Sequence, residues 1–190
     1  MKSWYDIYKE RMNERYSAHI KEKYKPFIDE LNKADGYHYV ELGCGAGNIT
    51  KMVRQYHLYK NFTLIDSCPK MLSLAIENNP IMNCNFVCAD VTKNINIPLE
   101  MDRTVIHSHG LLEHFNDEEI CRIVALASNY AKTQIHYVPG AKYEKPSRGD
   151  ERLMTKQDWH SILVEIDRPL TWQISEFNSG YDFIIKLERS

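Results

Sequence analysis

The sequence predicts an α/β fold in which a seven-stranded, mostly parallel sheet carries helices on both faces. From residue 37 onward, short β-rich runs alternate with helical segments, a pattern typical of parallel strands that are joined by helices. The last two runs are separated by the turn Asn178-Ser179-Gly180, which predicts a hairpin and therefore an antiparallel strand at the end of the chain. The length of 190 residues suits a single domain.

The first 36 residues are predicted to be helical, because apolar and aromatic residues recur there at spacings of three and four. Pro26 either breaks this run or begins a second short helix at its first position. We expect residues 1–36 to form a helical lid over a core of residues 37–190. The recurring residues form one apolar and aromatic stripe, which consists of Tyr5, Tyr8, Met12, Tyr16, Ile20 and Tyr24. This stripe suits packing against the core as well as a cage around a substrate.

The elements of the core follow in order along the chain. Strands are expected at Tyr37–Leu42, Asn61–Ile65, Asn85–Cys88, Arg103–Ser108, Gln134–Val138, Leu170–Glu176 and Tyr181–Leu187. Helices are expected at Asn48–His57, Pro69–Asn78, Asp117–Lys132 and Thr155–Glu165. The stretch between Cys88 and Arg103 is too short and too polar to predict a helix.

Composition narrows the class of protein. A net charge of -2 argues against a general electrostatic grip on nucleic acid. The five cysteines are odd in number and form no CxxC pair, which favours reduced thiols in an intracellular protein and no metal site. The N-terminus lacks the apolar region of a signal peptide, and no apolar run reaches the length of a membrane span. We therefore expect a cytoplasmic protein that has no contact with a membrane.

The most informative segment is Glu41-Leu42-Gly43-Cys44-Gly45-Ala46-Gly47, which follows an expected strand and opens an expected helix. Its glycines let the backbone turn tightly and lie directly against a ligand. The spacing is GxGxG and not the GxGxxG of dinucleotide-binding enzymes, which disfavours an NAD-dependent oxidoreductase.

Acidic residues end the next two expected strands. Asp66 ends the second strand, where a carboxylate can accept hydrogen bonds from both hydroxyls of a ribose, and Asp90 ends the third. Taken singly, a glycine turn or an acid after a strand can be purely structural, as a tight turn or a helix cap. Because the carboxyl ends of neighbouring parallel strands converge on one crevice, the three features together predict a nucleoside-binding site.

These motifs resemble those of the class I methyltransferases that use S-adenosylmethionine (SAM). ELGCGAG resembles the first motif of that family, LIDSCPKML the second, CAD the third and HSHGLLEHF the fourth, over residues 37–139. Cys68 departs from the pattern, since many members have serine there. The resemblance implies a Rossmann-like three-layer sandwich with strand order 3-2-1-4-5-7-6, and SAM as the cofactor with S-adenosylhomocysteine (SAH) as its product.

The resemblance also implies a role for each motif position. The glycine loop would flank the methionine part, Glu41 would reach its amino group, Asp66 would hold the ribose, and Asp90 with the N–H of Val91 would read the adenine. Ser108 would line the methionine and acceptor side. The implied cofactor-binding residues are Glu41, Gly43, Cys44, Gly45, Gly47, Asp66, Ser67, Ala89, Asp90, Val91 and Ser108.

Methyl transfer from a sulfonium is an in-line displacement that depends mainly on positioning. A general base is needed only if the acceptor holds a proton. We prefer His109 for this role, with its ring on the opposite face from His107, and His114 is the second candidate. Tyr137, at the end of the fifth strand, is expected to border the acceptor pocket. Both histidines could instead serve only as loop hydrogen-bonding groups.

The acceptor is the least determined part of the prediction. The loop from Gly140 to Met154 contains Tyr143, Arg148 and Arg152, and its arginines could clamp an acceptor carboxylate or phosphate or could simply be solvated. With no added recognition domain, we expect a nitrogen or oxygen of a small molecule as the acceptor, and a monomer or homodimer. The alternatives are a methyltransferase of protein or tRNA, and a non-catalytic SAM-binding partner subunit.

Overall fold

The computed structural model describes residues 4–11, 14–57, 60–80, 83–93, 95, 97, 103–146 and 150–190, without the side chains of residues 4, 11 and 14–17. Within them lies one seven-stranded sheet with strand order β3-β2-β1-β4-β5-β7-β6. This confirms the predicted fold class and strand order. Two members of the N-terminal stripe, Met12 and Tyr16, and the loop residue Arg148 have side chains outside the described set.

The strands lie close to their predicted positions. They are β1 (His38–Leu42), β2 (Asn61–Asp66), β3 (Cys84–Cys88), β4 (Thr104–His109), β5 (Thr133–Pro139), β6 (Leu170–Phe177) and β7 (Asp182–Arg189). The first five pair in parallel, whereas β7 runs antiparallel to both β5 and β6. The expected turn before β7 is a short 3-10 element, η3 (Asn178–Gly180), in which all three residues have positive φ. The hairpin ending is thereby confirmed.

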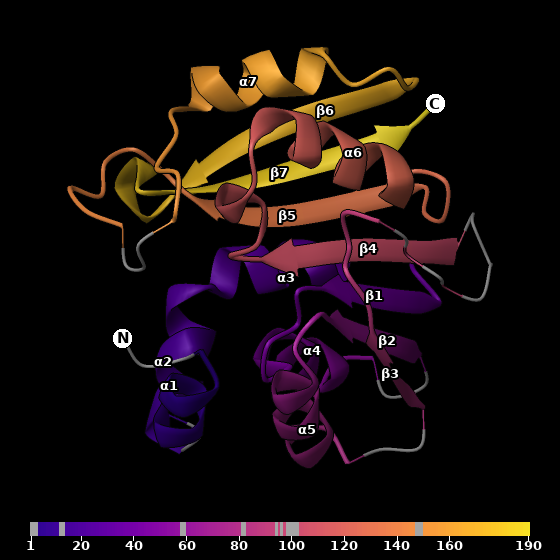
Figure 1. The fold of residues 1–190 in the computed structure, drawn as a ribbon, viewed down its shortest axis with the longest axis vertical. Coiled ribbons are helices and arrows are strands. Elements are labelled where there is room, and N and C mark those ends of the chain that lie inside the picture. Colours follow the sequence, from indigo (N-terminus) through magenta and orange to yellow (C-terminus); the bar gives the residue numbers. More distant parts are fainter. Residues whose placement is uncertain are drawn as a thin grey trace.

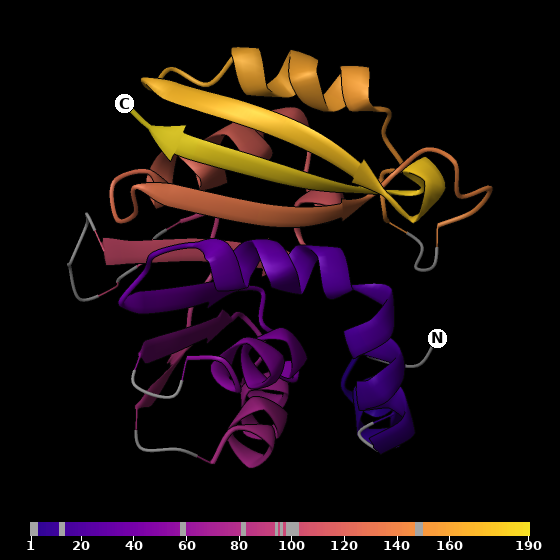
Figure 2. The same ribbon diagram turned by 180° about the vertical axis from the view of Figure 1, so that it is seen from behind.

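Helices cover both faces of the sheet, as Figures 1 and 2 show from opposite sides. On one face lie α3 (Lys25–Lys33), α4 (Asn48–Arg54) and α5 (Pro69–Asn78), and on the other lie α6 (Asp117–Ala127) and α7 (Lys156–Val164). Two further helices, α1 (Trp4–Arg11) and α2 (Glu14–Lys23), lie beside α5 in Figure 2 and precede α3 in the chain. None of the described helices is both long enough and apolar enough to span a bilayer.

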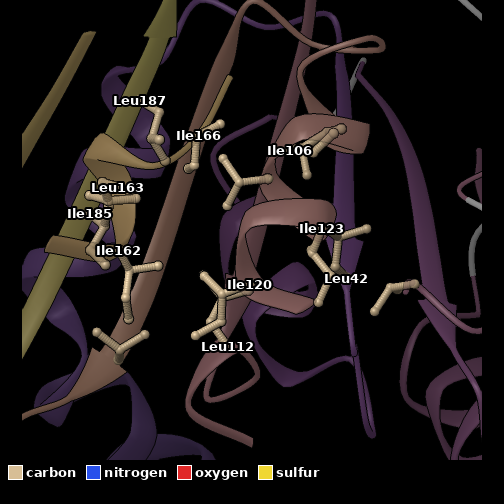
Figure 3. Packing of buried hydrophobic residues seen from close by; sticks show 14 of the residues in the cluster. Leu42, Ile106, Leu112, Ile120, Ile123, Ile162, Leu163, Ile166, Ile185 and Leu187 are labelled. Carbon is tan, nitrogen blue, oxygen red and sulfur yellow. The ribbon is translucent and has the colours of Figure 1, made fainter. Parts of the chain in front are cut away.

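The core consists of two main clusters, one on each side of the sheet. The cluster under α6 and α7 includes Leu42, Ile106, Ile120 and Leu163, which are labelled in Figure 3. It also takes in Val91, Ile95 and Ile97, so an irregular segment after β3 covers part of the sheet on this side. The cluster under α3, α4 and α5 contains, among others, Phe27, Leu31, Tyr39, Val53 and Phe62.

Two helices, α4 and α6, end earlier than predicted, and α4 ends at Arg54 and not at His57. The second short helix that Pro26 could begin is confirmed as α3, which carries Pro26 in its first turn, where the missing N–H of proline costs no hydrogen bond. Helix α6 ends at Ala127, five residues before the predicted Lys132, because Tyr130 and Ala131 already turn the chain toward β5 through hydrogen bonds to Ala127 O. Neither change moves the carboxyl ends of the parallel strands, where the candidate site lies.

Candidate functional site at the carboxyl edge of the sheet

The glycine loop connects β1 to α4 in a conformation that only glycine adopts readily. Gly43, Gly45 and Gly47 have φ of +62°, +53° and +67°. A Cβ on Gly43 would lie 2.5 Å from Leu111 Cδ1, and one on Gly47 would lie 2.5 Å from Asn79 Nδ2. The space beside Gly45 is more open, since the nearest atom to its Cβ position is the flexible Met71 Cε at 3.4 Å. The loop therefore packs tightly at its two ends and leaves its middle accessible.

Asp66 joins this loop to the end of β2. Its Oδ2 accepts a hydrogen bond from the N–H of Gly45 at 2.9 Å, and its Oδ1 accepts one from the N–H of Cys68 at 2.8 Å. Burial raises the pKa of the Asp66 carboxyl, while the two backbone hydrogen bonds act in the opposite direction. Ser67, which lies between Asp66 and Cys68 in the chain, is exposed.

Asp90 lies one strand further along the same edge. Its carboxylate accepts hydrogen bonds from Thr92 N at 3.0 Å and Thr92 Oγ1 at 2.7 Å, and Lys93 Nζ lies 3.0 Å away. The Thr92 hydroxyl and Lys93 lower the pKa of Asp90 to about 2, so the group is ionised at neutral pH. Ala89 donates its N–H to Asp66 O at 3.2 Å, which holds the ends of β2 and β3 together. The structure thus places the three predicted features on one continuous edge.

Glu41 lies beneath the loop on β1 and is buried. Its Oε2 accepts hydrogen bonds from Thr50 N at 3.1 Å and Thr50 Oγ1 at 2.5 Å. Burial raises the pKa of Glu41 to about 7 despite these two bonds. The carboxyl group is therefore held in one orientation at the boundary between the glycine loop and an adjoining cavity.

The cavity has a volume of about 320 Å³ and opens between the glycine loop, the ends of β4 and β5, and helix α2. Glu41, Cys44 and Asn48 line it on the loop side. The other walls come from helices α1 and α2, from β4, β5 and η2 (Leu112–His114), and from the loop after β5; they include Tyr8, Lys23, Tyr24, His109, Glu113, His114, Tyr137 and Tyr143. The three predicted catalytic residues all reach this cavity, although Asp66 and Asp90 lie beyond it along the edge.

His109 and Tyr137 form the aromatic wall of the cavity. Their rings stack with centroids 4.4 Å apart, and Tyr24, which lies between α2 and α3, meets His109 edge-on at 4.1 Å. Burial, together with the nearby charge of Lys23, lowers the pKa of His109 to about 3, so the ring is neutral. Its Nε2 is buried and has no hydrogen-bond partner among the described residues. Tyr137 donates its hydroxyl proton to Asp182 Oδ1 at 2.7 Å, which fixes the ring.

The expected orientation of the two strand-end histidines is wrong. His107 and His109 lie on the same face of β4 and both contact Phe27 of α3, because side chains two positions apart on a strand point the same way. It is Ser108 that faces the other side, where its hydroxyl lies 2.8 Å from Nδ1 of His136. The side chain of Ser108 is thus directed to the opposite face of the sheet from His109, away from the cavity.

The remaining loop residues divide into two groups. His114 lines the cavity and places Nδ1 2.9 Å from Asp150 Oδ1, and Tyr143 donates to the carboxylate of Asp182. Arg152, in contrast, donates to Phe115 O at 2.6 Å and pairs with Asp117 at 2.5 Å. Arg152 therefore fastens the loop to the start of α6 and does not serve as an acceptor clamp.

Sequence reasoning did not select Glu113 as a site residue. Glu113 is 2% exposed and lines the cavity, and its Oε2 has no hydrogen-bond partner among the described residues. An isolated glutamate in a polar motif gives no sign in the sequence that its side chain turns inward. The turn of η2 decides this orientation.

A mostly parallel sheet whose glycine loop and strand-end acids share one edge has the arrangement of Rossmann-like folds, in which ligands bind at the carboxyl ends of the strands. Residues 40–134 match the family described as "Methyltransferase domain". The chain belongs to the class I SAM-dependent methyltransferases.

Individual proteins agree with this assignment. The chain is similar to trans-aconitate 2-methyltransferases of Klebsiella pneumoniae, at 35% identity over 38% of this chain and 29% of the relative, and of Delftia acidovorans, at 28% identity over 55% of this chain and 39% of the relative. It thus matches well under half the length of either. A SAM-dependent methyltransferase structure from Clostridium acetobutylicum has the same fold, with a TM-score of 0.66 at 15% identity, over 91% of this chain and 97% of that one.

Proposed function

We propose that the chain transfers a methyl group from SAM, by in-line displacement, to a nitrogen or oxygen of a small molecule held in the cavity beside His109. The observation that carries the proposal is that the glycine loop and the cavity lie side by side at the carboxyl edge of the sheet. The loop that Asp66 ties down through Gly45 borders, through Cys44 and Glu41, the cavity that His109 and Tyr137 close. A cofactor along the loop and an acceptor in the cavity would therefore meet at the ends of β1 and β4.

The residues along this edge suit SAM. The open middle of the loop at Gly45 admits a ligand against the backbone, which a Cβ there would obstruct. We assign the methionine part to Gly43, Gly45 and Gly47 with Glu41 near its amino group, the ribose to Asp66, and the adenine to Asp90 and the N–H of Val91. When bound, SAM supplies the electrophilic methyl group on its sulfonium.

The protein's own contribution is positioning and the exclusion of water. The ring of Tyr137, fixed by Asp182, stacks on the neutral ring of His109, so both rings are held in place before an acceptor enters. Such positioning can supply roughly 7–11 kcal/mol in favourable cases. Tyr8 of α1 lies 3.9 Å from the Cβ position of Gly45, and Tyr24, which joins α2 to α3, contacts His109. We therefore propose that the described part of the predicted lid, residues 1–36, covers both the cofactor site and the acceptor cavity.

A small acceptor is supported by the size of the cavity and by the names of the two curated relatives, which act on trans-aconitate. The cations Lys23 and Lys145 at the cavity suit an acceptor that carries acidic groups. The net charge of -2 disfavours tRNA as the acceptor.

The test combines binding with turnover. In calorimetry, SAM and SAH should bind the purified protein and NAD should not. With methyl-labelled SAM, four acceptors are supplied in separate assays: trans-aconitate, metabolite extract, tRNA and lysate protein. We expect the label to enter a small molecule in one of the first two assays. Label in tRNA or protein would favour the macromolecular alternative, and SAM binding without any turnover would favour a partner subunit.

One variant links the cavity to turnover. His109→Ala should lower turnover more than SAM affinity, because His109 lies on the acceptor side of the site. His160→Ala, in an exposed position on α7, is the matched control and should behave as the wild type. Equal turnover in the two variants would exclude His109 from the active site.

A further inference from the structure

Glu113 has an environment that packing alone does not explain. It lies in η2, directly after the end of β4, and its side chain folds back beneath Gly110, whose Cβ position lies 3.4 Å from Glu113 Oε1. The residue is 2% exposed, yet it lines the 320 Å³ cavity. A buried carboxyl oxygen without a partner costs free energy, of the order of 1–3 kcal/mol, so its retention beside a cavity calls for a ligand.

The groups around Glu113 do not neutralise it. His109 and His114 lie on the same cavity wall, and Asp150 and Glu151 face it from the loop after β5, where their negative charges act in the same direction as burial. The guanidinium of Arg152 is bound to Phe115 O and Asp117, although the N–H of Arg152 donates to the backbone oxygen of Glu113 at 2.9 Å.

The other candidate bases around the cavity are less suitable. Nδ1 of His114 is paired with Asp150, so only its Nε2 could act as a base, and the hydroxyl of Tyr137 donates to Asp182. Glu41 already accepts two hydrogen bonds from Thr50. Nε2 of His109 is free among the described residues, but burial and Lys23 lower the pKa of this ring to about 3, which makes it a weak proton acceptor.

We propose that Glu113 is the catalytic base of the methyl transfer and that the acceptor is therefore a hydroxyl or an amine that still carries its proton. This rests on the proposed function. The lone pair of the acceptor atom forms the bond to the methyl carbon while the carbon–sulfur bond breaks, and its electron pair stays on sulfur, giving SAH. The proton of the acceptor atom passes to a carboxylate oxygen of Glu113.

Burial raises the pKa of Glu113 to about 8, with Glu151 and Asp150 adding to the effect. A base of that strength is well matched to proton transfer near neutral pH. Its ionised fraction grows as the pH rises through this value, so the rate should grow with it.

The experiment compares wild type with Glu113→Gln, which preserves size and polarity. The acceptors are the one that the wild type uses in the labelled-SAM assay and, in parallel, trans-aconitate, whose ionised carboxylates carry no proton. For Glu113→Gln we expect kcat/KM to fall about 10²–10⁴-fold, the dissociation constant of SAH to stay unchanged, and the rise of kcat/KM with a midpoint near pH 8 to disappear. Glu118→Gln on the outer face of α6 is the matched control.

A second measurement does not depend on turnover. In protein labelled with ¹³C-carboxyl glutamate, the resonance that Glu113→Gln removes should titrate near pH 8, well above the ordinary glutamate value of 4.5. A midpoint near the ordinary value, a Glu113→Gln rate within the scatter of Glu118→Gln, or exclusive use of a carboxylate acceptor would each overturn the proposal. If the wild type bound no SAM, the proposed function itself would fail, which is a different result.

Discussion

The carboxylate of Asp66 lies 2.9 Å from the backbone nitrogen of Gly45, so the end of β2 holds the middle of the loop that follows β1. The same carboxylate also receives the N–H of Cys68 at 2.8 Å. The side chain of Asp66 thus shapes the glycine loop and also lies next to the place where the ribose of the cofactor is expected. These two roles can be separated experimentally.

Asp66→Ala should weaken binding of SAH by roughly two to four orders of magnitude, since it removes the hydrogen bonds to both ribose hydroxyls and each bond to a charged group contributes about 1.5–3 kcal/mol. If Asp66 holds the ribose, the wild type should also bind the 2′-deoxyribose analogue of SAH more weakly than SAH, and Asp66→Ala should no longer discriminate between them. Calorimetry with both ligands measures this. Discrimination that persists in the variant would assign Asp66 to the loop alone.

Two glycines of the same loop should respond differently to substitution by alanine. A Cβ on Gly47 would lie 2.5 Å from Asn79 Nδ2 and 2.7 Å from Leu64 Cδ2, so Gly47→Ala combines overpacking with an unfavourable positive φ. We expect a loss of about 2–4 kcal/mol in the free energy of unfolding. Gly45→Ala meets no atom closer than 3.4 Å and should lose only about 1–2 kcal/mol, while SAH affinity falls sharply. Urea unfolding and calorimetry on both variants test the contrast.

Two buried histidines form a second matched pair. Neither ring nitrogen of His107 has a hydrogen-bond partner among the described residues, whereas His136 bonds Ser108 at 2.8 Å and Gln134 at 3.2 Å. His107→Leu should therefore leave stability unchanged or raise it, because no partner loses a bond. His136→Leu should cost about 1–3 kcal/mol for each polar group left unpaired. A similar loss in both variants, measured by urea unfolding, would contradict this reading.

Stability should pass through a maximum near pH 6.5. Burial lowers the pKa of His107, His109 and His136 to about 3, so below 6.5 the unfolded chain binds protons there that the native state does not. Stability is therefore lost as the pH falls below 6.5. The pKa of Glu41 and Glu113, at about 7 and 8, lies above the ordinary 4.5, so the native state binds the extra protons as the pH rises from 4.5.

These two contributions oppose each other between pH 4.5 and 6.5, where three histidines outweigh two carboxyls. Above 6.5 only the carboxyls remain, and stability should decline until they ionise, by about 1.4 kcal/mol per pH unit for each group. Urea unfolding between pH 5 and 8.5 measures the curve. Glu113→Gln should make the alkaline decline shallower, and an unchanged decline in that variant would argue against a raised pKa of Glu113.

Much of the fold follows from local sequence pattern. Strands such as Asn61–Asp66 consist of short runs bounded by polar turns, and the helix Pro69–Asn78 begins where a proline favours a first turn. The glycine loop and the acid at position 66 were also predictable, because glycine adopts positive φ most readily, and strand ends of a parallel sheet converge by topology. The early ends of α4 and α6 depend on packing and local hydrogen bonding that the periodic pattern does not record.

The sequence by itself therefore determined the class of protein and the edge at which its cofactor is expected, since both depend on residues close together along the chain. Only the tertiary structure decided which side chains face the acceptor cavity. Ser108 turned away and Glu113 turned inward because strand alternation and the turn of η2 set their directions. The pKa values of His109 and Glu113 were likewise beyond the sequence, because they arise from burial by α2, α3 and the loop after β5, segments far apart in the chain.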